Sequence, residues 1–198
     1  MALIWLNEKP FTTLWVDGHH ENFDILSSIP IENWHGGTVH RVRPNVFHLM
    51  RGQLYEIDGL TFFAMDGASS HDINDGIPDP SSPDFKKQYR SLRKKNTVVR
   101  ALRSSWRPDE LMSDAEYLSA LDSLEKAHWK VDYVISHCAL SSIAQSLRPT
   151  YKPDSLTEFF EMVSRQLGFQ YWLFGHYHGN NIVHNRFVLQ WEQIVRVA

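Results

Sequence analysis

The chain has 198 residues, of which 42% are hydrophobic and 22% are charged, and its net charge is −3; this is the composition of a soluble globular protein with enough material for one core. No apolar run reaches membrane-spanning length, and MALIWLNEKPF at the start is too short and too acidic for a secretory signal. The single cysteine, Cys138, excludes an internal disulfide framework and fits a reducing cytosol. We therefore expect one cytoplasmic domain over residues 1–198, with no membrane partner.

The first half of the chain predicts short strands followed by a charged helix. TTLWVDG at 12–18 is typical of a strand, and 37–67 predicts several strands separated by Pro44, Gly52 and Asp-Gly turns. A polar, acidic loop follows at 69–84. The next stretch, 85–107, holds nine of the 20 Lys and Arg residues and predicts a helix followed by a connector.

The second half alternates helices and strands. Helices are predicted at 113–129, with a capping box formed by Ser113 and Glu116, and at 155–168, with a capping box formed by Ser155 and Glu158. VDYVISH and YWLF predict buried strands, and the last residues predict a hairpin about Asn185-Arg186. The pattern indicates a single α/β domain, and we expect the segments LWV, YVIS and YWLF to lie in one sheet.

Three of these strands each run into histidine at the carboxyl end, in LWVDGHHEN, YVISHCA and WLFGHYH. Ligands of α/β proteins bind beyond the carboxyl ends of strands, and imidazole is a common ligand for Zn, Mn, Fe and Ni. If the chain stays extended, His176 and His178 point to the same side and Tyr177 to the other. The pattern predicts a metal site built from these strand ends, although a lone histidine after a strand is more often structural.

The same segments resemble a known family. VDGHHENF, VISHCA and FGHYHGN are similar, in order and spacing, to the third, fourth and fifth motifs of calcineurin-like metallophosphoesterases, and NWHGGTVH and GASSHDI resemble a bacterial subgroup. The likeness covers essentially the whole chain. It implies a sandwich of two mixed β-sheets flanked by helices.

The resemblance also implies a function and residue roles. Members of the family hold two divalent metals and hydrolyse phosphate mono- or diesters with a metal-activated water, so the substrate would be a phosphorylated small molecule or a phosphodiester. By resemblance, His137, His176 and His178 would ligate metal. His20 would orient the substrate or protonate the leaving oxygen, and Glu21 would hold His20 or cap the following helix. His71 and Asp72, in the GASSHDI loop that resembles the bacterial subgroup, would have a role on the substrate side of the site.

The chain departs from the family pattern in two places. It has no Gly-Asp and only one Asp-x-His, at residues 17–19, so the first βαβ unit with its Asp-x-His-Gly and Gly-Asp motifs is missing; the metal-binding Asn is replaced by His19. We therefore expect weak activity and one metal rather than two, held by His19, His137 and His176 with water or His178 in fourth place. Zn, Ni or Fe should bind better than the oxygen-preferring Mn or Mg. The missing unit should also expose the edge of the 12–18 strand, which predicts a homo-oligomer.

Other features keep plainer interpretations. The basic stretch at 86–107 could bind a nucleic-acid backbone, although a solvated helix face is favoured. A non-catalytic phosphate- or nucleic-acid-binding protein derived from the enzyme family is therefore the alternative function. Cys138 is interpreted as a buried thiol and DINDG as a turn. The remaining histidines are interpreted as surface or core-edge residues: His35, His40, His48, His128 and His184.

Overall fold

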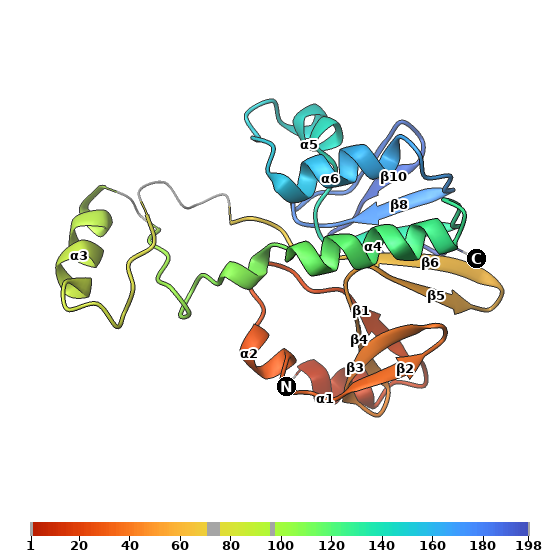
Figure 1. The fold of residues 1–198 in the computed structure, drawn as a ribbon, viewed down its shortest axis with the longest axis horizontal. Coiled ribbons are helices and arrows are strands. Elements are labelled where there is room, and N and C mark those ends of the chain that lie inside the picture. The colour runs from red at the N-terminus through yellow and green to blue at the C-terminus, as the bar shows by residue number, and fades with distance from the viewer. Residues whose placement is uncertain (1, 71–75, 96–97, 198) are drawn as a thin grey trace.

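Two mixed β-sheets with helices around them form the body of the protein (Figure 1). The computed structural model describes residues 2–70, 76–95 and 98–197. The first sheet has the strand order β1-β4-β3-β2, and the second has the order β5-β6-β7-β8-β10-β9. β1 is parallel to β4, and β6, β7, β8 and β10 run parallel to one another, whereas the other neighbours are antiparallel. The expected α/β class with two mixed sheets is therefore confirmed.

The elements have the following bounds. The strands of the first sheet are β1 (Thr13–Trp15), β2 (Ile31–Trp34), β3 (Gly37–Arg43) and β4 (Val46–Leu49). Those of the second sheet are β5 (Gln53–Ile57), β6 (Leu60–Met65), β7 (Tyr133–Ser136), β8 (Tyr171–Phe174), β9 (Asn181–Val183) and β10 (Phe187–Leu189). The helices are α1 (Ala2–Asn7), α2 (Phe23–Leu26), α3 (Phe85–Lys95), the 3₁₀ turn η1 (Pro108–Glu110), α4 (Asp114–Lys126), α5 (Ser141–Leu147) and α6 (Ser155–Ser164).

Two apolar clusters hold the layers together. The smaller cluster joins the sheets, since Val39, Phe47 and Leu49 of the first sheet pack with Tyr55 and Ala64 of the second. The larger cluster lies between the second sheet and the helices, where Figure 1 shows α4 and α6 running across the sheet. Its members from the sheet and the helices include Phe63, Trp172, Leu124, Leu156 and Phe160. Full burial of one such side chain stabilises the fold by about 1.5–3 kcal/mol, so these clusters fix the strand ends that carry the histidines.

The expectation that LWV, YVIS and YWLF share one sheet is wrong. β7 and β8 are neighbours in the second sheet, but β1 belongs to the first, where Trp15 is paired with His48 of β4. Apolar alternation marks a segment as a strand but carries no information about its partner. In the first sheet β1 is partly buried: Leu14, and Val16 just after the strand, pack on the cluster between the sheets.

Of the two predicted capping boxes, the one before α4 is present and the one at α6 is formed by other residues. Ser113 and Glu116 form the expected capping box, with Glu116 N donating to Ser113 Oγ at 3.3 Å and Ser113 N donating to Glu116 Oε2 at 2.7 Å. At α6, however, the capping residue is Asp154 and its partner is Thr157, so Ser155 already lies inside the helix. Asp is as good an N-cap as Ser, and Asp154 follows Pro153, which disfavours an earlier start. The hairpin about Asn185 is confirmed by the antiparallel pairing of β9 with β10.

β1 lies at the end of the first sheet and is hydrogen-bonded to β4 alone among the described strands. Apolar side chains in the segment that precedes it are exposed, including Ile4 (58%), Trp5 (57%) and Phe11 (56%). An uncovered strand edge beside apolar surface tends to associate, so we expect a homodimer or larger oligomer. Light scattering of the protein as it elutes from a size-exclusion column should give at least twice the mass of one chain. Trp5→Glu should reduce it to the monomer mass, whereas Ile194→Glu, an equally apolar but remote exposed site, should not; a monomeric wild type would contradict the expectation.

Candidate metal centre

Three histidines from separate parts of the chain meet at the ends of β1, β7 and β8. His19 Nδ1 and His176 Nδ1 each lie 3.3 Å from His137 Nε2. Each residue offers one ring nitrogen to a group whose members all lie within 4.8 Å of one another, and all three side chains are partly buried. The predicted convergence of histidines is therefore present, although β1 reaches the site from the first sheet.

The backbone around the site explains how the rings come so close. β7 and β8 are parallel and in register, and Gly175 N donates to His137 O at 3.0 Å, so His137 and His176 leave the sheet side by side. Gly18 lies against the His137 ring: a Cβ on Gly18 would be 2.8 Å from His137 Cε1. A side chain at position 18 would therefore push the ring away, and the absence of one lets His19 approach.

An extended chain through GHYH would place His176 and His178 on the same side, but the chain does not stay extended there. His176 (φ 66°) and His178 (φ 50°) both adopt the left-handed conformation, and Tyr177 N donates back to Gly175 O at 2.8 Å. His178 consequently turns away from the group of three, and its ring stacks on Trp191 with the centroids 5.3 Å apart. Non-glycine residues with positive φ cost roughly 1–3 kcal/mol each and cluster at functional sites.

Two of the three nitrogen separations fit a tetrahedral transition metal. Zinc bonds imidazole nitrogen at about 2.0–2.1 Å, and two ligands at the tetrahedral angle are then about 3.3 Å apart. Both separations from His137 Nε2 have this value. Burial, with the neighbouring His20 and His178 acting in the same direction, lowers the pKa of His137 to about 4, so the ring is neutral at pH 7 and can act as a ligand. The donor set and its spacing therefore suit Zn and other metals that accept three nitrogen ligands.

The other predicted residues lie at different distances from this centre. His20 is exposed, and its ring centroid is 3.9 Å from that of His19. Glu21 is partly buried, and burial together with the negative charge of Asp17 raises the pKa of its carboxyl. His71 and Asp72 lie outside the described residues. His20 and Glu21 thus border the three-histidine group, and the imidazole of His20 is accessible to a substrate.

A buried charge network lies next to the loop that carries His19, His20 and Glu21. Asp17, 1% exposed, accepts hydrogen bonds from His48 Nε2 at 3.1 Å and from Arg51 Nε at 3.1 Å. Burial alone would raise the pKa of Asp17, but the His48 hydrogen bond and the Arg51 charge outweigh it and lower the pKa. Arg51 also donates to the carbonyls of Asp109 (2.8 Å) and Leu111 (3.2 Å). One guanidinium therefore ties the histidine loop to the segment that leads into α4.

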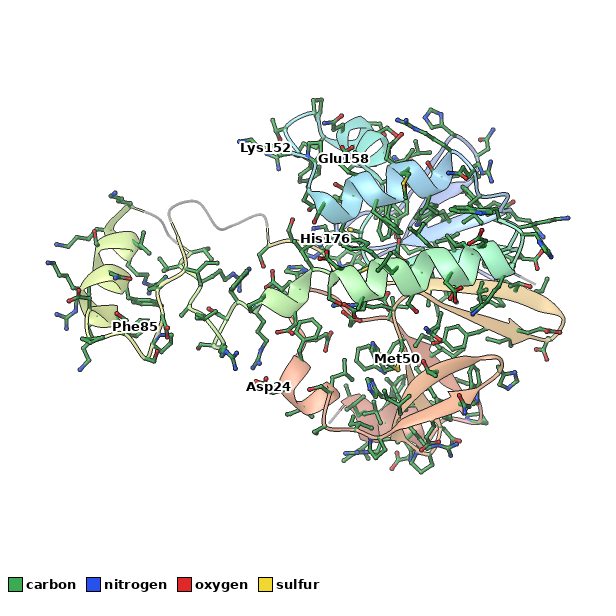
Figure 2. All side chains as sticks on the ribbon, viewed as in Figure 1. Asp24, Met50, Phe85, Lys152, Glu158 and His176 are labelled. Atoms are coloured by element: carbon green, nitrogen blue, oxygen red, sulfur yellow. The ribbon has the colours of Figure 1, made fainter. Side chains whose placement is uncertain are left out.

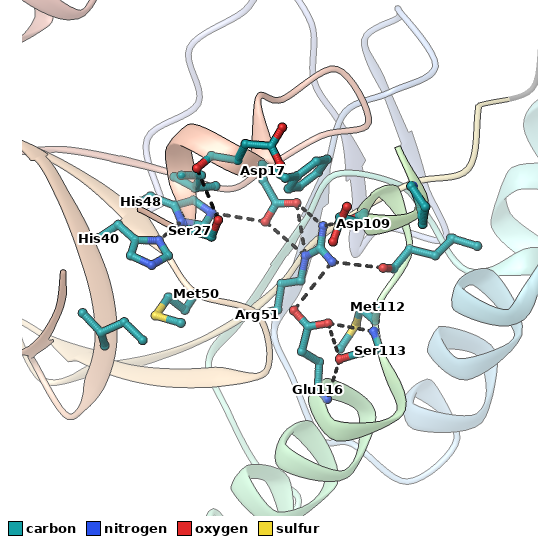
Figure 3. Close-up of a pocket in the computed structure, with 16 residues that line it drawn as sticks. Asp17, Ser27, His40, His48, Met50, Arg51, Asp109, Met112, Ser113 and Glu116 are labelled. Carbon is teal, nitrogen blue, oxygen red and sulfur yellow. Dashed lines mark hydrogen bonds and ion pairs between the residues drawn. The ribbon is translucent and has the colours of Figure 1, made fainter. Parts of the chain in front are cut away.

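Figure 3 shows this network in the wall of a pocket of about 590 Å³. Arg51 lies between Asp17 on one side and Glu116 on the other, and the His40–His48 pair extends the network along the first sheet. His40 Nδ1 and His48 Nδ1 are 3.1 Å apart, and both rings are buried. The interpretation of His40 and His48 as surface or core-edge residues is wrong for both. The sequence held one sign that His40 and His48 are neighbours. Each lies four residues from Pro44, and a turn there places them opposite each other in β3 and β4.

Asp17 and His48 also form a second possible metal group with Asp66. Asp66 is completely buried, and neither carboxyl oxygen has a hydrogen-bond partner, although the nearby Asp17 amide favours the charged form slightly. Burial and the Asp17 charge raise the pKa of Asp66 well above its usual value. Arg51 already supplies the positive charge that balances Asp17, so we interpret the group of Asp17, His48 and Asp66 as structural.

No family model matches the chain, and neither does any curated protein. None of the helices in the described ranges combines the length and the apolar composition that crossing a membrane requires.

Proposed function

We propose that the protein is a metal-dependent phosphoesterase of the calcineurin-like type, with one metal held by His19, His137 and His176. The observation that supports this most directly is the pair of 3.3 Å nitrogen separations about His137 Nε2. The two-sheet sandwich and the positions of the histidines at the strand ends agree with the resemblance in sequence. The divalent transition metal we propose is zinc, with nickel or iron as substitutes.

When bound, such a metal supplies a Lewis acid for phosphoryl oxygens and lowers the pKa of a water molecule. The residues of the chain supply the rest. The exposed ring of His20, beside His19, can bind a phosphoryl oxygen and deliver a proton to the leaving oxygen. Glu21 follows His20, and burial raises the pKa of its carboxyl, which makes it a second candidate for carrying a proton at the site. The half-buried setting of the three ligands limits access of bulk water.

Catalysis should be modest, because no carboxylate joins the group of three nitrogen ligands among the described residues. Phosphoesterases with paired metals stabilise both the attacking and the leaving oxygen, whereas one metal can serve only one of them at a time. We therefore expect a slow enzyme for phosphate mono- or diesters with good leaving groups.

The test is metal content followed by turnover of an aryl phosphate and a bis-aryl phosphodiester. After dialysis, wild type should keep close to one equivalent of Zn, Ni or Fe per chain, and a chelator should abolish turnover that one equivalent of zinc restores. His19→Asn should bind the metal more weakly, since it exchanges an imidazole for a poorer amide ligand. Two equivalents, no metal in either protein, or turnover that resists the chelator would each contradict the proposal.

A further inference from the structure

α3, with the described residues 76–84 and 98–107 on either side of it, forms a basic arm that stands apart from the two sheets (Figure 1 and Figure 2). No residue of α3 is buried, so the helix contributes nothing to either apolar cluster. Residues 76–107 contain nine of the 20 basic residues of the chain and two of its 23 acidic residues. The arm thus has a net charge of +7 and the rest of the chain −10, which is a strong separation of charge for a protein of net charge −3.

The cations of α3 share one face. At 100° per residue, five of them fall within about a third of the helix circumference. They are Lys86, Lys87, Arg90, Arg93 and Lys94. Lys86 and Arg90, and likewise Arg90 and Lys94, are four residues apart, where like charges destabilise a helix by about 0.2–0.5 kcal/mol per pair. An 11-residue helix with no fully buried residue is already marginal, so an anionic partner would stabilise it.

The opposite face of α3 is apolar and is already occupied by its own chain. Phe85, Tyr89 and Leu92 are partly buried, and the rings of Phe85 and Tyr89 are 5.5 Å apart. Leu92 lines a groove together with Ile77 and Pro78. A helix that binds a lipid surface must insert its apolar face, and the partial burial of Phe85, Tyr89 and Leu92 leaves little apolar surface for this. The side chains of all five cations, in contrast, are exposed.

We propose that the basic face of α3 binds the phosphate backbone of nucleic acid. A row of Lys and Arg along one helix face is the electrostatic footprint of backbone binding, and a repeating polyphosphate can contact all five cations at once. The pairing would be independent of base sequence, because the face carries charges rather than groups that read base edges. It does not depend on the metal centre or on phosphoesterase activity.

The experiment measures binding of the full chain to a fluorescent single-stranded oligonucleotide of mixed sequence by anisotropy. With five phosphate contacts, the dissociation constant should rise about 100-fold between 50 and 200 mM salt. The triple variant Lys86→Gln, Arg90→Gln, Lys94→Gln should bind more weakly and show only about a 7-fold rise. The control variant Lys130→Gln, Lys152→Gln, Arg165→Gln removes the same charge from exposed positions on the body and should behave like wild type.

Several results would overturn the proposal. The first is no binding of the oligonucleotide by wild type at 50 mM salt. The second is an equal loss of affinity in the two triple variants. The third is arm-dependent binding to phosphatidylserine vesicles or polyglutamate that the oligonucleotide does not displace. The α3 variant changes a helix in which no residue is buried, and the control variant changes exposed residues of the body. Both should therefore keep the thermal melting curve of wild type. A variant that melts early is replaced by its single substitutions, each of which should lower the salt slope by about 0.7.

Discussion

His137→Ala is expected to remove both the bound metal and phosphoesterase turnover. Its Nε2 is the atom from which both other ligand nitrogens lie 3.3 Å away, so its loss leaves two imidazoles with no common partner. Loss of an outer partner of a metal ligand already weakens binding by about 10–100-fold, and loss of the ligand itself should exceed that range. Metal analysis and competition with a chromophoric chelator would measure the change. Binding within about tenfold of wild type would contradict the assignment of His137 as a central ligand.

A second pair of variants tests the geometry while leaving all three histidines in place. Gly18→Ala places a Cβ 2.8 Å from His137 Cε1 and should displace the ring, with a loss of metal affinity of about 10–100-fold. Gly175→Ala is the matched control: it precedes His176 directly, but its Cβ would meet nothing closer than Gln190 O at 3.6 Å. Equal affinities in the two variants would show that the spacing about His137 does not set metal binding.

His20→Ala separates metal binding from proton transfer. His20 is exposed beside His19, and it is not among the three grouped ligands. The variant should therefore keep its metal and lose about 10²–10⁴-fold in turnover, the usual contribution of a general acid. Loss of metal in His20→Ala would instead make it a ligand, and unchanged turnover would remove it from the proposed chemistry.

The sequence was sufficient for the local features of the site but not for its assembly. Strand ends followed by histidine correctly indicated that His19, His137 and His176 would converge, because apolar runs and their breaks are local properties. The membership of β1 in the first sheet was not predictable in this way, since it depends on pairing with β4, more than 30 residues later. An extended chain would have placed His178 beside His176, but both residues adopt left-handed backbone, a departure that the alternation of side chains along a strand does not reveal.

The network behind the site shows a different limit. Asp17 is far in the sequence from His48 and Arg51, and a charged residue such as Asp or Arg is, taken alone, typical of a surface. Their burial becomes favourable only when all three are brought together, because each satisfies the charge or hydrogen bonds of another. A cooperative polar group of this kind leaves no periodic pattern in the sequence. The paired positions of His40 and His48 about Pro44 were its only local sign.

Arg51→Ala is expected to destabilise the fold by about 3–5 kcal/mol, because it leaves Asp17 buried without its cation. Asp17 is 1% exposed and Arg51 8%, so the guanidinium, and not water, compensates the carboxylate in the wild type. The carbonyls of Asp109 and Leu111 also lose a donor, which loosens the segment before α4. Urea unfolding monitored by circular dichroism would measure the change.

Arg41→Ala is the matched control for this substitution. Arg41 also pairs with a carboxylate, Glu32 at 2.9 Å, but the two side chains are 45% and 43% exposed. Such surface pairs contribute about 0–1 kcal/mol, so the control should unfold almost as wild type does. Adding Asp17→Asn to Arg51→Ala should recover part of the lost stability, because the uncompensated charge is then gone. If Arg51→Ala cost no more than Arg41→Ala, the Asp17–Arg51 pair would not be what holds the histidine loop against the sheets.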